Sequence, residues 1–70
     1  MIDRINIDKS IMGGKPVIKG TRLTVQFILG LLSKGMTHSD ILLEYPDLTF
    51  EDIEACLNYA SEKIDELIFI

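Results

Sequence analysis

One run of ten residues organises this chain: Gly13-Gly14-Lys15-Pro16-Val17-Ile18-Lys19-Gly20-Thr21-Arg22. Pro16 fixes its own φ at about −65° and favours an extended backbone for the residue before it. Val17 and Ile18 are β-branched and favour a strand, and Gly20 can adopt the positive φ that a tight reversal requires. Because residues 22–24 can return as the partner strand, the run predicts a small β-hairpin with a basic tip.

A short strand and a helix are expected on either side of this hairpin. Residues 4–7 alternate between polar and apolar side chains, which is typical of a strand. We expect this strand to pair with the hairpin or with a second copy of the chain, because an unpaired edge would be exposed. Thr24 is a good N-cap for a helix from Val25 to about Lys34, with Gly35 as its stop.

This first helix carries more apolar surface than one side of a small core requires. Its core stripe follows helical spacing and consists of Val25, Ile28, Leu29 and Leu32. Phe27 and Leu31 extend the stripe sideways, so we expect the helix to be buried on two sides. Gly30 weakens the helix and is expected to let another backbone approach closely.

Two capping patterns predict two further helices. Thr37-x-x-Asp40 begins a short helix that Pro46 stops, and its apolar side is predicted to consist of Ile41, Leu42, Leu43 and Tyr45. Thr49-x-x-Asp52 begins a third helix over about 50–66. The inward stripe of the third helix is predicted to consist of Ile53, Leu57, Ala60, Ile64 and Leu67, with Cys56 beside it. Two capped helices joined by residues 45–49 are typical of a helix-turn-helix.

The same residues carry a resemblance to a known family. The run from Gly13 to Arg22 is similar to the G-G-K-P-x-I-x-G-T-R hallmark of the prokaryotic family called domain of unknown function 433 (DUF433). The resemblance continues through residues 28–35, 41–46 and 48–53 and covers roughly residues 5–62. It implies a helix-turn-helix-type fold, and members look like antitoxins of the VapB kind that pair with PIN-like nuclease toxins and are presumed to bind DNA.

These patterns together predict a mainly α fold in a single domain over residues 1–70. A three-helix helix-turn-helix core, homeodomain-like or winged-helix-like, is expected over 24–70. A head over 1–23 is expected to contain the short N-terminal strand and the β-hairpin. The residues of the run that are expected to shape the hairpin are Gly13, Gly14, Pro16, Gly20 and Thr21.

The composition predicts a cytoplasmic protein that associates with itself. One cysteine excludes an internal disulfide, no apolar run reaches the length of about 20 residues that spans a membrane, and no signal peptide is recognisable. A chain of 70 residues with 47% hydrophobic residues has little interior for its apolar side chains. A homodimer is therefore expected. The residues predicted to meet a second copy or a toxin are Phe27, Leu31, Leu67, Ile68, Phe69 and Ile70.

The charge is distributed unevenly. Residues 1–35 hold six basic and two acidic side chains, a net charge of +4, whereas residues 36–70 hold one basic and nine acidic, a net charge of −8. The third helix begins with Glu51, Asp52 and Glu54, which phosphate would repel. If operator DNA is bound, we expect the contacts to come from Lys15, Lys19 and Arg22. An acidic second half suits a basic protein partner.

No pattern predicts an enzyme, a metal site or a cofactor. Gly13 and Gly14 lack the spacing of a P-loop. The only histidine, His38, is expected to be an exposed residue near a helix cap, and Cys56 an inert thiol of the core. The leading hypothesis is an antitoxin-like DNA-binding regulator. The alternative is a protein-interaction module with a helix-turn-helix-derived fold and no DNA binding.

Overall fold

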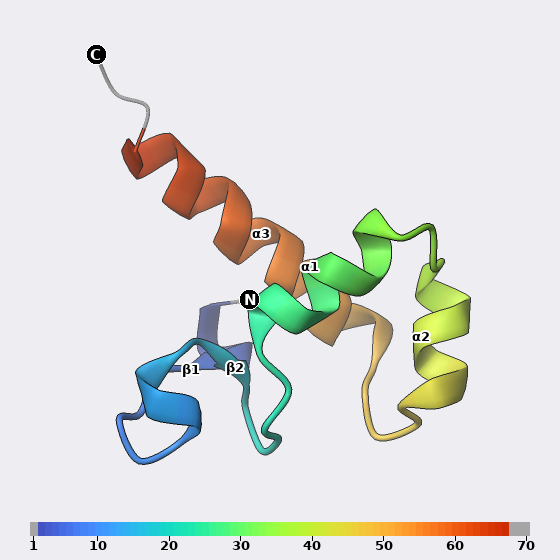
Figure 1. The fold of residues 1–70 in the computed structure, drawn as a ribbon, viewed down its shortest axis with the longest axis horizontal. Helices are drawn as coiled ribbons and strands as arrows, with labels where there is room; N and C mark the ends of the chain where they lie inside the picture. The colour runs from blue at the N-terminus through green and yellow to red at the C-terminus, as the bar shows by residue number, and fades with distance from the viewer. Residues whose placement is uncertain (1, 68–70) are drawn as a thin grey trace.

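The computed structural model describes residues 2–67 of the chain. A 3-10 turn (η1, Ile2–Arg4) leads into strand β1 (Ile5–Asn6), and a second such turn (η2, Met12–Gly14) precedes strand β2 (Val17–Ile18). Three helices follow: α1 (Val25–Ser33), α2 (His38–Glu44) and α3 (Phe50–Leu67). The small sheet and α2 lie on opposite sides of α1, and α3 crosses α1 and projects beyond it (Figure 1). This mainly helical arrangement confirms the predicted fold class.

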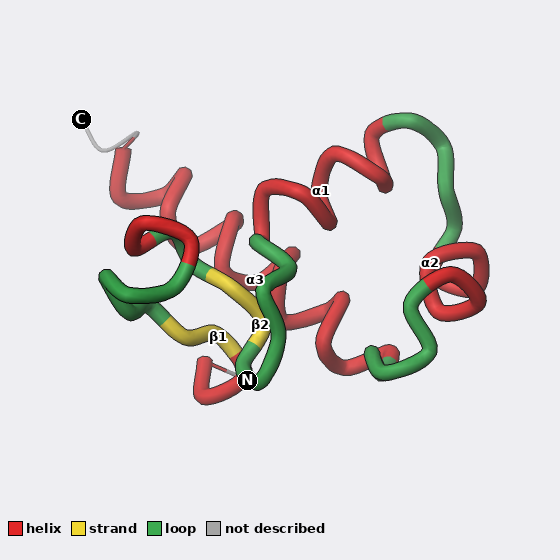
Figure 2. The backbone as a smooth tube through the Cα atoms, turned by 60° about the horizontal axis from the view of Figure 1, so that its bottom comes forward, coloured by secondary structure: helices red, strands yellow, loops and turns green. Residues whose placement is uncertain are grey.

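The two strands, drawn in yellow in Figure 2, form an antiparallel pair. Ile5 lies opposite Ile18, so the N-terminal strand pairs with the hairpin as predicted. The predicted return of residues 22–24 is shorter than a full strand. It consists of an isolated bridge between Val17 and Thr24, and the Ile18 N–H donates to the Leu23 carbonyl at 2.9 Å. Gly20, with φ +82°, makes the reversal possible.

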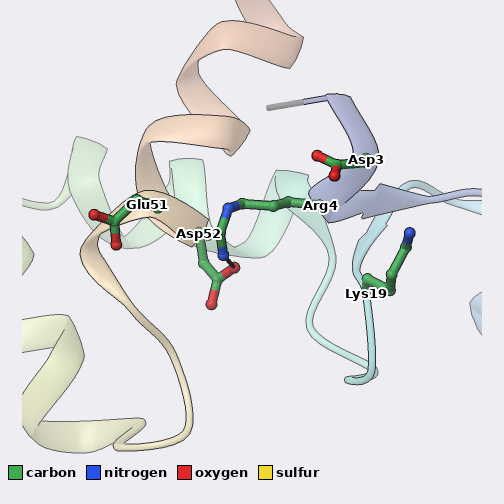
Figure 3. Close-up of a pocket in the computed structure, with 5 residues that line it drawn as sticks. All are labelled: Asp3, Arg4, Lys19, Glu51 and Asp52. Carbon is green, nitrogen blue, oxygen red and sulfur yellow. Dashed lines mark hydrogen bonds and ion pairs between the residues drawn. The ribbon is translucent and has the colours of Figure 1, made fainter.

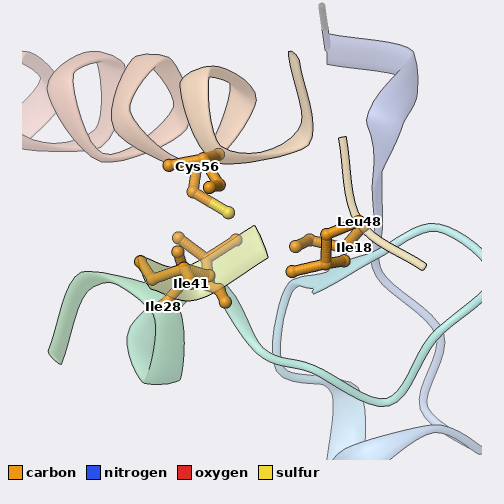
Figure 4. Packing of buried hydrophobic residues seen from close by; sticks show 7 residues of the cluster. Ile18, Ile28, Ile41, Leu48 and Cys56 are labelled. Carbon is orange, nitrogen blue, oxygen red and sulfur yellow. The ribbon is translucent and has the colours of Figure 1, made fainter. Parts of the chain in front are cut away.

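One hydrophobic cluster joins the sheet to all three helices. Figure 4 shows Cys56 of α3 above Ile28 of α1 and Ile41 of α2, with Ile18 of β2 and Leu48 alongside. Ile18, Ile28, Ile41 and Cys56 are at most 1% exposed. Because β2 supplies Ile18, the helices depend on the head for part of their interior.

The predicted inward stripe of α3 is wrong for most of its residues, since Ile53 is buried but Ala60 only partly so. The buried residues of this helix are Asp52, Ile53, Ala55 and Cys56. Leu57, Ile64 and Leu67 are exposed instead, at 38%, 53% and 81%. The physical reason is the length of α3. Its 18 residues span about 27 Å, and the end of the helix extends past α1 and α2.

Two further expectations for the helices are wrong. Leu43, which is predicted to lie on the apolar side of α2, is 82% exposed in the structure. Gly30 admits no close backbone among the described residues, because a Cβ built there would have no atom within 4 Å apart from its own helix. Phe27 meets the edge of the Tyr45 ring at 5.9 Å yet stays 41% exposed, so the second side of α1 is only partly covered.

The three predicted N-caps are all present. The Thr24 hydroxyl accepts from the Phe27 N–H at 3.0 Å. Thr37 and Asp40 form a reciprocal capping box at the start of α2, and the Thr37 N–H holds the pKa of the Asp40 carboxyl below its usual value. Thr49 and Asp52 make the same pair of bonds at the start of α3, at 2.9 and 3.2 Å. Among residues 2–67, no helix is long and apolar enough to cross a membrane.

Substituting two glycines by alanine should change stability in opposite directions. Gly30→Ala removes the entropic cost of a mid-helix glycine in open space and should raise the free energy of unfolding by about 0.5–1 kcal/mol. Gly20→Ala also meets open space, but its φ of +82° should cost about 1–2 kcal/mol. Urea unfolding measures both variants. A Gly20→Ala protein as stable as the wild type would contradict the left-handed turn.

The two capping aspartates should contribute unequally to stability. Asp52→Ala removes a cap and a partner of Arg4 that is only 8% exposed, and should lower the free energy of unfolding by about 2 kcal/mol. Asp40→Ala removes only an exposed cap and should cost less. Because the pKa of Asp40 is lowered by folding, its contribution should be present at neutral pH and vanish as the pH falls through that pKa. Equal losses at neutral pH would show that Arg4 adds nothing.

Candidate functional site

The start of α3, where a recognition helix would read DNA, is occupied by contacts within the chain. The Arg4 guanidinium donates from Nη1 to Asp52 Oδ1 at 3.0 Å, across 48 residues of sequence. Together with Asp3, Lys19 and Glu51 they line a hollow of about 550 Å³. Figure 3 shows Arg4 reaching toward Asp52, while Glu51 points away from both. The first turn of α3 therefore forms a structural joint, in which Asp52 binds Arg4 of the N-terminal turn. The side chain that this turn presents to solvent is the negatively charged Glu51.

A second contact joins α2 to α3. A hydrogen bond of 2.9 Å links His38 Nε2 to Glu54 Oε2, and the His38 ring lies 5.0 Å from the Phe50 ring. The expectation that His38 is an exposed cap residue is therefore wrong, since its side chain is 30% exposed and has two partners. No local pattern indicates this pairing, because the two residues are 16 positions apart and lie on different helices.

No catalytic chemistry gathers around the remaining candidates. Cys56 is fully buried, and desolvation, with a contribution from the Asp52 charge, raises the pKa of its thiol to about 11. The thiol is therefore uncharged at neutral pH, as expected of an inert core residue. Across residues 2–67, no group of three or more His, Cys, Asp or Glu side chains could hold a metal ion.

The three predicted basic residues do not form one surface. Lys15 and Arg22 line a common hollow of about 250 Å³ at the beginning of α1, whose other lining residues are Met12, Leu23, Thr24 and Phe27. Lys19 lines two other hollows, one with Asp3, Glu51 and Asp52, and one with Glu44 and Asp47. Lys15 and Arg22 thus converge, whereas Lys19 lies among carboxylates.

The glycine-rich run shapes the backbone beside this hollow. Gly13 and Gly14 have φ of +68° and +89°, and Met12 precedes them with φ +49°, a conformation that costs a non-glycine residue about 1–2 kcal/mol. Thr21 fixes the later turn, because its hydroxyl donates to the Ile18 carbonyl at 2.8 Å and accepts from the Leu23 N–H at 3.0 Å. The Pro16 carbonyl accepts from the Val25 N–H at 2.9 Å. These bonds hold the flanks of Lys15 and Arg22 against α1.

The electrostatics around this hollow favour an anion. Neither Lys15 nor Arg22 takes part in an ion pair or hydrogen bond of its side chain within residues 2–67, and both are exposed. The first turn of α1 contains no acidic residue to offset the positive end of the helix dipole, although the N–H groups of Val25 and Phe27 already donate to Pro16 and Thr24. Two unpaired cations and a helix N-terminus therefore face the same solvent.

The residues predicted to meet a partner differ in their environment. Leu31 packs against the core of its own chain, and Phe27 is half covered by Tyr45. Leu67 is exposed on the projecting half of α3. Ile68, Phe69 and Ile70 lie outside the described residues. Of the six, Leu67 belongs to an uncovered apolar surface, which continues along α3 through Ile64 and Leu57.

The comparisons with known proteins agree with this fold. None of the curated proteins matches the chain. The crystal structure of a DUF433 member protein from Anabaena variabilis ATCC 29413 superimposes with a TM-score of 0.83 at 28% sequence identity over 90% of this chain. The chain spans 62% of the length of that protein. The sequence profile of the family described as "Protein of unknown function (DUF433)" matches residues 5–60, which include the glycine-rich run and every residue of the core cluster. The chain therefore belongs to the DUF433 family.

Proposed function

We propose that this protein is an antitoxin-like regulator that binds operator DNA and neutralises a PIN-like nuclease toxin. The observation that carries the DNA-binding part is the convergence of the unpaired Lys15 and Arg22 at the beginning of α1. Phosphate contacts dominate the affinity of proteins for DNA, and helix N-termini bind phosphate through their free N–H groups. The resemblance to the DUF433 family, whose members look like antitoxins of the VapB kind, supports the regulatory role.

In this proposal α3 is not the reading helix. A recognition helix inserts its N-terminal residues into the major groove. Here Asp52 is bound to Arg4 and Glu54 to His38, and Glu51 presents a negative charge to solvent. Repulsion between these carboxylates and the DNA backbone opposes that docking. The chain would instead approach DNA with its basic head, and its helix-turn-helix would serve as a scaffold.

The toxin contact is proposed on the outer surface of α2. Leu43 is 82% exposed there, and Asp40 and Glu44 are exposed neighbours on the same helix. An apolar anchor surrounded by carboxylates suits a nuclease, because a protein that binds nucleic acid presents basic side chains. The acidic second half of the chain, with its net charge of −8, would attract such a partner.

Removing the converging cations should weaken DNA binding. We expect a Lys15→Ala and Arg22→Ala double variant to lose affinity for duplex DNA from upstream of its own gene, and the slope of log affinity against log salt should fall by about 0.9 per lost phosphate contact. Lys34→Ala is the matched control, because it removes an exposed cation at the other end of α1. Lys19→Ala should have a smaller effect, since Lys19 lies among acids.

Fluorescence anisotropy over a range of salt concentrations measures each variant. A double variant that binds like the wild type would refute the assignment of Lys15 and Arg22. If the wild type shows no salt-dependent binding, alone or with its toxin, the protein-interaction module without DNA binding replaces the regulator.

Replacing the exposed anchor of α2 should release the toxin. We expect Leu43→Asp to abolish co-purification with the product of a nuclease gene adjacent to this one, because a carboxylate in an apolar contact is left without a partner. Leu43 is exposed, so the variant should fold normally, which circular dichroism checks. Ile7→Asp is the matched control, since Ile7 is 59% exposed and lies outside α2. Equal toxin binding by Leu43→Asp and wild type would exclude this surface.

A further inference from the structure

The projecting half of α3 carries an apolar stripe that the chain itself leaves uncovered. Leu57, Ile64 and Leu67 are 38%, 53% and 81% exposed, and Ala60 lies between them. A hollow of about 530 Å³ on this surface is lined by Leu57, Ala60, Ser61, Ile64 and Asp65. Ala60 and Lys63 also line a hollow with the beginning of α1, and the end of α3 projects away from the other elements (Figure 1).

The stripe has the spacing of a coiled-coil seam. Leu57, Ala60, Ile64 and Leu67 follow one another at intervals of three, four and three residues, as the a and d positions of a heptad do. The core of the chain uses the first turns of α3, through Asp52, Ile53 and Cys56, and the stripe continues the line of Ile53 along the helix. The helix therefore has a first seam for its own core and, further along, a second seam for another helix.

We propose that this second seam pairs antiparallel with α3 of a second copy of the chain. The proposal goes beyond the proposed function and does not depend on it. A two-fold axis near Glu62 would place Leu57 against the partner's Leu67, and Ala60 against the partner's Ile64. Each layer then combines complementary sizes, a small alanine with a branched isoleucine, or two leucines. A two-fold pairing of this kind is self-complementary, as a homodimer requires.

The charges on both flanks of the stripe suit the same register. On one flank, Asp65 would lie opposite the partner's Asn58, which can donate a hydrogen bond to it. On the other flank, the two Lys63 side chains approach each other, but each carries its own counter-charge in Glu66, at 3.5 Å. Each Lys63 ammonium group also lies 5.4 Å from the centre of its own Tyr59 ring. Glu62 faces away from the stripe, so no carboxylate meets another across the seam.

A second copy is favoured over a basic toxin as the occupant of this surface. The stripe itself is apolar, and the side chains that border it are Ser61, Lys63 and Asp65, a mixture without a strong sign. A basic partner would gain little there, whereas a copy of the same helix finds matched layers and neutral flanks. Small domains bury too little apolar surface to be stable without help, and this pairing covers three large apolar side chains that the core leaves exposed, Leu57, Ile64 and Leu67.

Sedimentation equilibrium over a range of protein concentrations tests the pairing. We expect a wild-type dimer, and we expect Ile64→Asp or Leu57→Asp to weaken dimerisation by about 100-fold, because the carboxylate would be buried without a partner. Leu43→Asp is the matched control and should remain dimeric, since Leu43 is exposed on α2. Circular dichroism and cooperative urea unfolding show whether the variants are folded.

Cysteine cross-linking tests the direction of the helices. In the antiparallel register Ser61 lies close to its own symmetry mate, so Ser61→Cys should form an intermolecular disulfide, whereas the two copies of Leu67→Cys should lie about 15 Å apart along the pair. A parallel pair would bring the two copies of Leu67 together and hold the two copies of Ser61 apart, so cross-linking of Leu67→Cys alone would refute the proposed register. A monomeric wild type at high micromolar concentration, or a dimer that survives Ile64→Asp, would overturn the proposal. So would a monomer whose stripe variants lose only the toxin, because the stripe would then belong to the toxin contact.

Discussion

The position of Asp52 is the constraint on which the rest of this small structure depends. Its carboxylate accepts the Thr49 N–H at the start of α3 and the Arg4 guanidinium from the N-terminal turn. Through it, the first residues of the chain and the last helix are fixed to each other. With that joint in place, β1 lies beside β2, and Ile18 of β2 enters the cluster between the helices. The bond from Thr49 caps the helix locally, whereas the bond from Arg4 spans 48 residues of sequence. Asp52 therefore couples the start of a helix to the tertiary fold.

The same joint uses the start of α3 for contacts within the chain. Arg4 neutralises the charge of Asp52, one of the acidic residues at the start of α3. The helix that gives the fold its helix-turn-helix character therefore holds the chain together. The surfaces left over are chemically distinct: a basic hollow at the beginning of α1, an apolar and acidic surface on α2, and an apolar stripe on α3. Each can be altered without disturbing the cluster around Ile18, Ile28 and Ile41.

The sequence predicted those features of the fold that depend on neighbouring residues. Caps at Thr24, Thr37 and Thr49 are decided by residues three positions apart, and the reversal at Gly20 by one backbone angle. The contact between Arg4 and Asp52 could not be predicted, because nothing in either local pattern shows which of several cations a distant carboxylate will meet. Periodicity also failed on α3. Leu57, Ile64 and Leu67 repeat at helical spacing, and that spacing is the same for an inner core and for a surface that another helix would cover.

The candidate site was predictable to a similar extent. The excess of positive charge in residues 1–35 indicates Lys15, Lys19 and Arg22 as candidate phosphate contacts. Composition cannot say which way each side chain points from a hairpin, and the structure separates Lys19 from the other two. The hollow itself depends on Met12, Leu23 and Phe27, apolar residues that charge patterns do not mark.

The division of α3 into two halves also bears on how such proteins diversify. Residues up to Tyr59 pack against the core, whereas Ile64 and Leu67 beyond it are exposed, and substitutions at exposed positions usually change the stability of the single folded chain by less than about 0.5 kcal/mol. A duplicated gene could therefore exchange the side chains of the distal half freely while its product still folds. Two paralogues in one cell would become insulated from each other after a few such exchanges, and new pairing specificities would arise without any intermediate that fails to fold.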